Sequence, residues 1–134
     1  MNLLVLAPEP VDADIVRGAL GGGEDLADAK ILYVSPALNA SAAAFWVSDS
    51  DAAIGEARER VAQTERALGE DGVQARGVAG ESEPLLALQD ALATFQADRI
   101  LVFVHDDDEQ RYREDDVVGE AERRFGIPVT EARI

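Results

Sequence analysis

The chain has 134 residues, nearly half of them apolar, and a formal net charge of −15 at pH 7. This length fits a single domain, residues 1–134, with a core of its own. The acidic balance argues against nucleic-acid and anionic-membrane partners, because these are held mainly by clustered Lys and Arg. The absence of cysteine excludes disulfides and thiolate chemistry. No apolar run is long enough for a membrane span or a signal peptide, so we expect a cytoplasmic protein.

Short apolar runs alternate with helical patterns along the chain. In order, the sequence predicts a strand at residues 3–6, a helix from a cap at 12 to the glycines at 21–23, a strand at 31–34, and a helix from a cap at 48–51 to 69–72. There follow a strand at 73–79, a helix that opens at 80–84 and reaches 95, a strand at 100–104, a helix from a cap at 115 or 116 to 126, and a strand at 129–134.

Two of these elements have informative patterns. The second helix is amphipathic: Ala57, Val61 and Leu68 mark its apolar side, and we assign Arg60 to its charged outer side. Residues 100–104 (ILVFV) are apolar at every position. Such a strand is typically covered on both faces, in the middle of a parallel sheet between layers of helices.

The order of elements predicts an open α/β fold of Rossmann-like type: one five-stranded parallel sheet with helices on both faces and right-handed crossovers. Ligands of such sheets bind beyond the carboxyl ends of the strands. Pro8, Ser35 and Gly80 stand near predicted strand ends, and His105 and Asp106 follow the fourth strand. If the protein binds a ligand, we expect these five residues to line the cleft.

Seven acidic residues follow the fourth strand, within residues 105–116. Asp106 and Asp108 offer oxygen ligands for a divalent metal and His105 is a candidate general base, so a metal-dependent hydrolase is one alternative. The segment has no glycine where an EF-hand loop needs one, and Ser35 has no nucleophile-elbow pattern around it. We favour a solvated acidic loop with His105 as a hydrogen-bonded strand cap, and we assign no metal ligand and no catalytic residue.

Three stretches of the sequence resemble universal stress proteins. They are GVAGESEPLLAL at residues 77–88, ADRILVFV at 97–104 and FGIPV at 125–129. In that family they correspond to the glycine turn with the third helix, the fourth strand, and the passage from the last helix to the last strand. The resemblance implies the strand order 3-2-1-4-5 and a homodimer joined through the last strand, which here starts at Val129 and ends at Ile134.

Many universal stress proteins bind ATP through a Gly-x-x-Gly motif after the fourth strand and a later Gly-Ser or Gly-Thr pair. Here residues 105–116 contain no glycine, and Gly119 is followed by Glu120. The resemblance therefore implies the branch without ATP binding: a non-enzymatic regulatory or protein-interaction domain with no cofactor. A binder of small ligands or nucleotides with a divergent loop is the alternative.

Two segments are candidates for protein contacts. Phe45 and Trp46 either cover the core or form an apolar patch for a partner. Glu131 and Arg133 of the last strand either guard a free sheet edge or pair with Arg133 and Glu131 of a second copy.

Gly77 and Gly80 precede a helix and would offer free amides to an anion. Two glycines are a weak signal for such a site, and the neighbouring acids Glu81 and Glu83 would repel an anion. A tight turn that requires positive φ is the favoured interpretation.

Overall fold

The computed structural model describes residues 2–21, 26, 29–36, 50–80, 84–104 and 119–133. The strands are β1 (Asn2–Leu6), β2 (Lys30–Pro36), β3 (Gln74–Gly80), β4 (Arg99–Val104) and β5 (Val129–Arg133). The helices are α1 (Ala13–Ala19), α3 (Ser50–Glu70) and α4 (Pro84–Leu92), and residues 119–125 are also helical. Every predicted strand and helix has a counterpart in this order.

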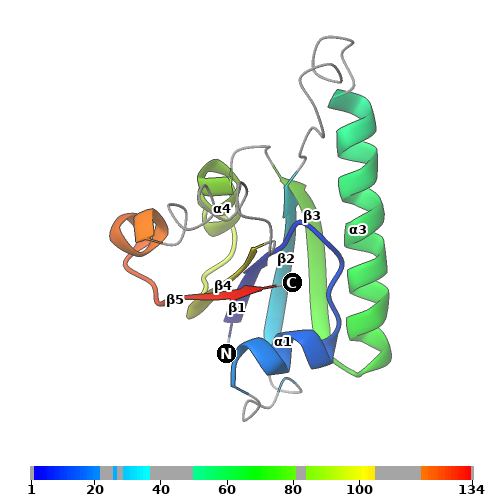
Figure 1. Ribbon diagram of the computed structural model, residues 1–134, viewed down its shortest axis with the longest axis horizontal. Helices are drawn as coiled ribbons and strands as arrows, with labels where there is room; N and C mark the ends of the chain where they lie inside the picture. Colours follow the sequence, from blue (N-terminus) through cyan, green and yellow to red (C-terminus); the bar gives the residue numbers. More distant parts are fainter. Residues whose placement is uncertain are drawn as a thin grey trace.

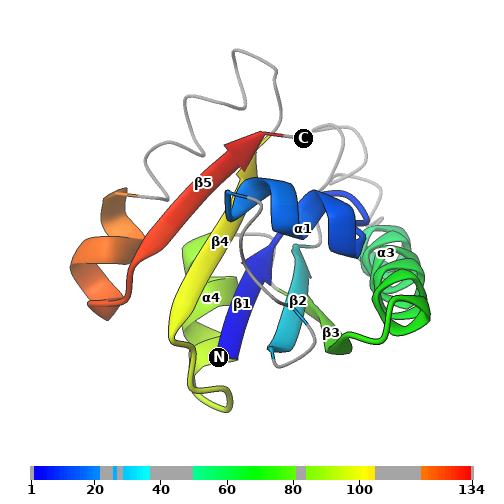
Figure 2. The ribbon, with the colours of Figure 1, turned by 90° about the horizontal axis from the view of Figure 1, so that it is seen from below.

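All five strands are parallel, in the order β3-β2-β1-β4-β5 (Figure 1). This confirms the predicted open α/β sheet. Figure 2 shows α1 on one side of the sheet and α4 on the other. The long helix α3 runs beside β3, and its first turns extend past the carboxyl ends of the strands (Figure 1). Among the described residues, no helix combines the length and the apolarity that crossing a bilayer requires.

Side chains of the central strand alternate between two cores. In β1, Leu3 and Val5 pack on the side of α1 and α3, whereas Leu4 and Leu6 pack on the side of α4. All four are at most 4% exposed. Burying each such side chain contributes roughly 1.5–3 kcal/mol to the free energy of folding. The strand is therefore held from both faces, as a parallel sheet between helix layers requires.

Two local predictions are confirmed. The residues of β4 from Ile100 to Phe103 are at most 2% exposed, so this strand is covered on both faces. The backbone N–H of Ile15 donates to Oδ1 of Asp12 at 2.9 Å, which caps the start of α1. Such a cap satisfies one of the amides that the first turn of a helix leaves without a partner.

The second strand is longer than predicted. It starts at Lys30 and reaches Pro36, whose partner in β3 is Gly80. Ser35 is therefore inside the strand, opposite Ala79, and does not begin the following loop. The reason is tertiary, because β3 supplies hydrogen-bonding backbone along the whole length of β2.

Candidate functional site

Three of the five residues expected around a ligand lie at one edge of the sheet. Pro8 follows the end of β1, Ser35 is the next-to-last residue of β2, and Gly80 is the last residue of β3. The carboxyl ends of the strands meet at this edge because all strands are parallel. His105 and Asp106 are outside the described residues.

Ser35 and Gly80 face opposite sides of the sheet. The side chain of Ser35 has no exposed surface and contacts α3. A Cβ atom on Gly80 would instead meet the Cβ atom of Ala87 in α4, at 3.0 Å. The structure therefore brings the two residues to the same edge but does not point them toward a common ligand.

Three buried hydroxyl groups gather on the α3 side of this edge. Tyr33 and Ser35 belong to β2 and Thr64 belongs to α3, and none of the three has exposed surface. Tyr33 and Ser35 share a face because they are two residues apart in a strand. The hydroxyls of Ser35 and Thr64 lie near the Tyr33 hydroxyl and both act to lower its pKa. We call these three residues the hydroxyl cluster; it links β2 directly to α3.

The hydroxyl cluster also holds the loop between β1 and α1. The Tyr33 hydroxyl donates to the carbonyl oxygen of Glu9 at 2.9 Å and lies 3.3 Å from that of Ala7. Oγ1 of Thr64 accepts from the backbone N–H of Val11 at 3.1 Å. Each such bond contributes about 1 kcal/mol, and leaving one partner buried and unpaired costs more. The loop backbone is therefore anchored both from the sheet and from the helix.

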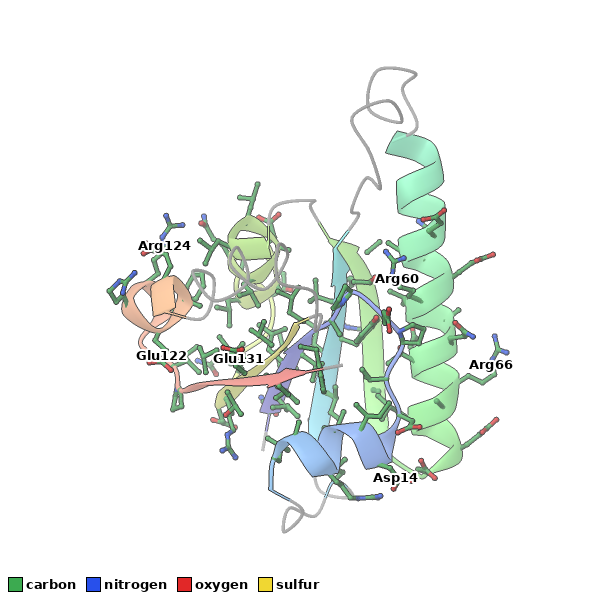
Figure 3. All side chains as sticks on the ribbon, in the orientation of Figure 1. Asp14, Arg60, Arg66, Glu122, Arg124 and Glu131 are labelled. Atoms are coloured by element: carbon green, nitrogen blue, oxygen red, sulfur yellow. The ribbon has the colours of Figure 1, made fainter. Side chains whose placement is uncertain are left out.

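Arg60 extends the hydroxyl cluster. Its Nε donates to Oγ of Ser35 at 2.8 Å, and Figure 3 shows its side chain directed from α3 toward the sheet, whereas Arg66 points away. The assignment of Arg60 to the charged outer side of the helix is wrong, because the residue is half-buried and faces β2. It lies one turn before Thr64, on the same face of α3.

Tyr33, Arg60 and Thr64 are not among the residues predicted for the site. A signal for Thr64 is nevertheless present in the sequence, because it continues the apolar stripe of Val61 and Leu68 at helical spacing. A polar side chain at such a position must find a hydrogen-bond partner in the interior. The identity of that partner depends on the packing of α3 against the sheet.

Burial raises the pKa of the Tyr33 hydroxyl above its ordinary value of 10.0, because a buried phenolate would lose its hydration. The nearby hydroxyls of Ser35 and Thr64 and the charge of Arg60 oppose this rise, whereas the carboxylate of Glu9 adds to it. Burial is the largest of these influences. Tyr33 is therefore a neutral hydrogen-bond donor at physiological pH.

The contact with Arg60 does not activate Ser35 as a nucleophile. A guanidinium group stays protonated in proteins and cannot take the hydroxyl proton as a general base. Among the described residues, every buried side-chain nitrogen and oxygen has a hydrogen-bond partner. The hydroxyl cluster is suited to holding the β1–α1 loop and to orienting Arg60.

Close packing explains Gly77 and Gly80, and the predicted tight turn with positive φ is wrong. Both residues lie in β3, and the described glycines with positive φ are Gly21, Gly72 and Gly126. A Cβ atom on Gly77 would lie 2.6 Å from Cγ1 of Val61 in α3. The two glycines therefore let α3 and α4 approach the sheet from opposite sides.

Other predicted features fall on residues that the structure does not describe. These are the acidic segment, including Asp108, and the pair Phe45 and Trp46. Within the described ranges, no three acidic or histidine side chains are grouped as they would be around a metal ion.

No protein-family model matches this chain, and no curated protein matches it either. The strand order of the sheet and the contacts at its carboxyl edge are therefore the observations from which a function has to be argued.

Proposed function

We propose that the chain is a universal-stress-protein-like domain that acts by binding, in a regulatory or protein-interaction role, and catalyses no reaction. The parallel sheet with the order β3-β2-β1-β4-β5 carries this proposal, because the resemblance implies that order. Two of the three stretches that carry the resemblance, residues 77–88 and 97–104, contribute to β3, α4 and β4. A cytoplasmic location is part of the proposal.

The burial and hydrogen bonding of Ser35 support a role without catalysis. Its Oγ accepts a hydrogen bond from Arg60, and the side chain is fully buried. A general base would have to displace the guanidinium to reach this hydroxyl, and a substrate would have to reach it through packed side chains. The polar groups at this part of the edge therefore serve structure and binding better than acyl or phosphoryl transfer.

We propose a homodimer joined through β5. This strand pairs with β4 along one side, and a strand at the edge of a sheet offers its other side to a partner strand. In an antiparallel pairing centred on Ala132, Glu131 of one copy stands opposite Arg133 of the other, and the reverse. A pairing centred on Glu131 would instead oppose two like charges. Charge therefore selects the centre at Ala132.

A thermal-shift experiment tests the absence of the usual ATP site. We expect ATP, AMP and cyclic AMP to leave the melting temperature unchanged at constant ionic strength, because residues 105–116 contain no glycine and many acids. Magnesium chloride alone is the control. A stabilisation by several degrees with any nucleotide would favour the alternative, a nucleotide binder with a divergent loop.

The second alternative, a hydrolase that uses Asp106, Asp108 and His105 with a divalent metal, has its own test. Mg²⁺, Mn²⁺ and Ca²⁺ are added to the wild-type protein and to Asp106→Asn, with Asp71→Asn as a control at an exposed position. Stabilisation that Asp106→Asn removes and Asp71→Asn retains would favour the hydrolase. Equal behaviour of the three proteins supports the proposal of a solvated acidic loop.

A further inference from the structure

The strand β3 forms the edge of the sheet opposite β5, and Figure 2 shows it at that end beside α3. It pairs with β2 in one register from Gln74 to Gly80. Within the described part of the chain, no strand pairs with the side of β3 that faces away from β2, which we call the outer edge. Proteins usually protect such an edge with proline, a bulge or several charges. The strand (QARGVAG) has no proline, no bulge and one charged residue, Arg76.

The two faces of β3 are covered to different extents. On one face, Gly77 lies against Val61 of α3. On the other face, α4 meets the strand at its last residue, Gly80. Arg76 and Val78 share this second face with Gly80, because side chains two residues apart in a strand point the same way. Both are exposed, Val78 to 40%. The outer edge is therefore flanked by an apolar side chain and a positive charge.

The charge of Arg76 is not matched inside the sheet. Its neighbour in β2 is Leu32, and within the described ranges no acidic side chain pairs with it. A second copy added through its own β3 would not supply an acid, because the strand contains none. An antiparallel pairing centred on Arg76 would even oppose two guanidinium groups. Charge therefore disfavours a second copy at this edge and favours a different strand that carries an acidic residue.

We propose that the outer edge of β3 binds an extended segment of a partner protein as an additional strand, with an acidic side chain opposite Arg76 and an apolar side chain opposite Val78. In the added strand these two residues are two positions apart, so that both lie on the same face. Backbone hydrogen bonds to the outer edge would supply affinity, and the two side-chain pairs would supply selectivity. Because the whole chain has a net charge of −15, a segment with few further acids suits this edge best.

The inference rests on the protein-interaction role proposed above and names the chemistry of the partner. It is compatible with the proposed dimer, because β3 and β5 are opposite edges of the same sheet. Two copies joined through β5 would carry their β3 strands at the two outer ends of the combined sheet. Each copy would therefore offer one such edge.

Titration of the ¹⁵N-labelled full-length protein with the capped synthetic peptide TVTETVT tests this edge. One face of the peptide reads Val, Glu, Val in either chain direction, so it can meet Val78 and Arg76 in a parallel or an antiparallel pairing. We expect saturable shifts and slower hydrogen exchange at amides of β3. The peptide TVTKTVT, with lysine in place of glutamate, should bind at least about threefold more weakly.

Arg76→Glu should reverse this preference. It should weaken the binding of TVTETVT by at least about threefold and strengthen that of TVTKTVT, because the lysine then meets an opposite charge. A purely structural role of Arg76 would not produce the second effect. Arg66→Glu is the matched control: it makes the same charge change at an exposed position of α3 that points away from the sheet (Figure 3). It should change both affinities by less than about twofold.

Val78→Thr tests the apolar pair separately. It keeps the branched shape that suits a strand but replaces a methyl group with a hydroxyl, so both peptides should bind about twofold more weakly. Thermal melts check that each variant is folded. Both substituted side chains are exposed, so we expect folding to be retained.

The absence of saturable shifts in the wild-type protein, shifts that fall on β5 instead of β3, or equal affinities for the two peptides would overturn the proposal. A change of mass in solution with Arg76→Glu would also overturn it, because a second copy would then occupy the outer edge. The mass of the wild-type protein and its response to nucleotides test the proposed function without involving this edge. Failure of the peptide site is therefore distinguishable from failure of the proposed function.

Discussion

Arg60 of α3 and Ser35 of β2 stand 25 positions apart in the chain and are joined by a hydrogen bond of 2.8 Å between Nε and Oγ. The bond fastens the long helix to the carboxyl end of a strand. Beside it, Thr64 and Tyr33 hold the β1–α1 loop through hydrogen bonds to its backbone. One edge of the sheet is therefore organised by polar groups that sit inside an otherwise apolar core.

Thr64→Val should destabilise the protein by roughly 1–3 kcal/mol, because the shape is kept while the buried N–H of Val11 loses its acceptor. Thr64→Ser is the matched control: it keeps the hydroxyl and loses one methyl group, at a cost of about 1 kcal/mol. Urea denaturation measures both free energies of unfolding. Faster hydrogen exchange at the Val11 amide should accompany the valine variant alone. Equal stability of Thr64→Val and wild type would mean that this bond does not hold the loop.

Gly77→Ala should cost roughly 1–3 kcal/mol, because the new Cβ atom would lie 2.6 Å from Cγ1 of Val61, a stiff side chain packed on the sheet. Gly55→Ala provides the contrast. Gly55 lies in α3 with nothing within 4 Å of a Cβ atom, so alanine should stabilise the helix by about 0.5–1 kcal/mol. Combining Gly77→Ala with Val61→Ala should give a smaller loss than the sum of the two single changes. A fully additive double variant would argue against a clash between these residues.

Tyr33 should make the free energy of unfolding fall as the pH becomes alkaline. Burial raises its folded-state pKa above the unfolded value of 10.0, so the folded state prefers the neutral hydroxyl. The resulting contribution to stability is fully present below a pH of about 10 and is lost as the pH rises through the folded-state pKa. Denaturation at a series of pH values from roughly 8 to 11 should show this fall in the free energy of unfolding.

Tyr33→Phe is the matched variant for this pH dependence. It should be less stable at neutral pH by about 1–2 kcal/mol, since the loop loses a hydrogen-bond donor. Its stability should fall less steeply than that of the wild type above a pH of about 10. Parallel pH profiles for the two proteins would show that Tyr33 is not the titrating group.

The proposed dimer predicts a charge-reversal experiment on β5. Glu131→Arg should weaken dimerisation, because the introduced guanidinium would then oppose Arg133 of the second copy. The double change Glu131→Arg with Arg133→Glu should restore it, because opposite charges face each other again. Light scattering during size-exclusion chromatography at tens of micromolar protein gives the mass directly, and thermal melts check that each variant is folded. A wild-type monomer under these conditions would contradict the dimer.

Much of the fold was predictable because its signals are local. The cap at Asp12 is a contact between neighbouring residues, and the burial of β4 follows from an apolar residue at every position. Alternating strands and helices then allow few arrangements other than a parallel sheet with helices on both faces. The placement of Pro8, Ser35 and Gly80 at one edge of that sheet follows from the same argument.

The roles of individual side chains at this edge were not predictable in the same way. Arg60 lies among other charged residues in the sequence, and its periodic position alone does not show that it turns toward Ser35. Gly77 has the sequence context of a turn, yet it is required by the approach of Val61 from α3. In both cases the partner is supplied by a different element of the fold.

The sequence by itself determined the parallel α/β architecture, the burial of β4 on both faces and the acidic character of the chain, since all three depend on composition and on short-range patterns. The tertiary structure alone decided that Thr64 reaches Val11, 53 positions away, and that Arg60 reaches Ser35. Such contacts depend on the position and orientation in which α3 packs against the sheet. Many side chains together determine this packing, so no short stretch of sequence specifies it.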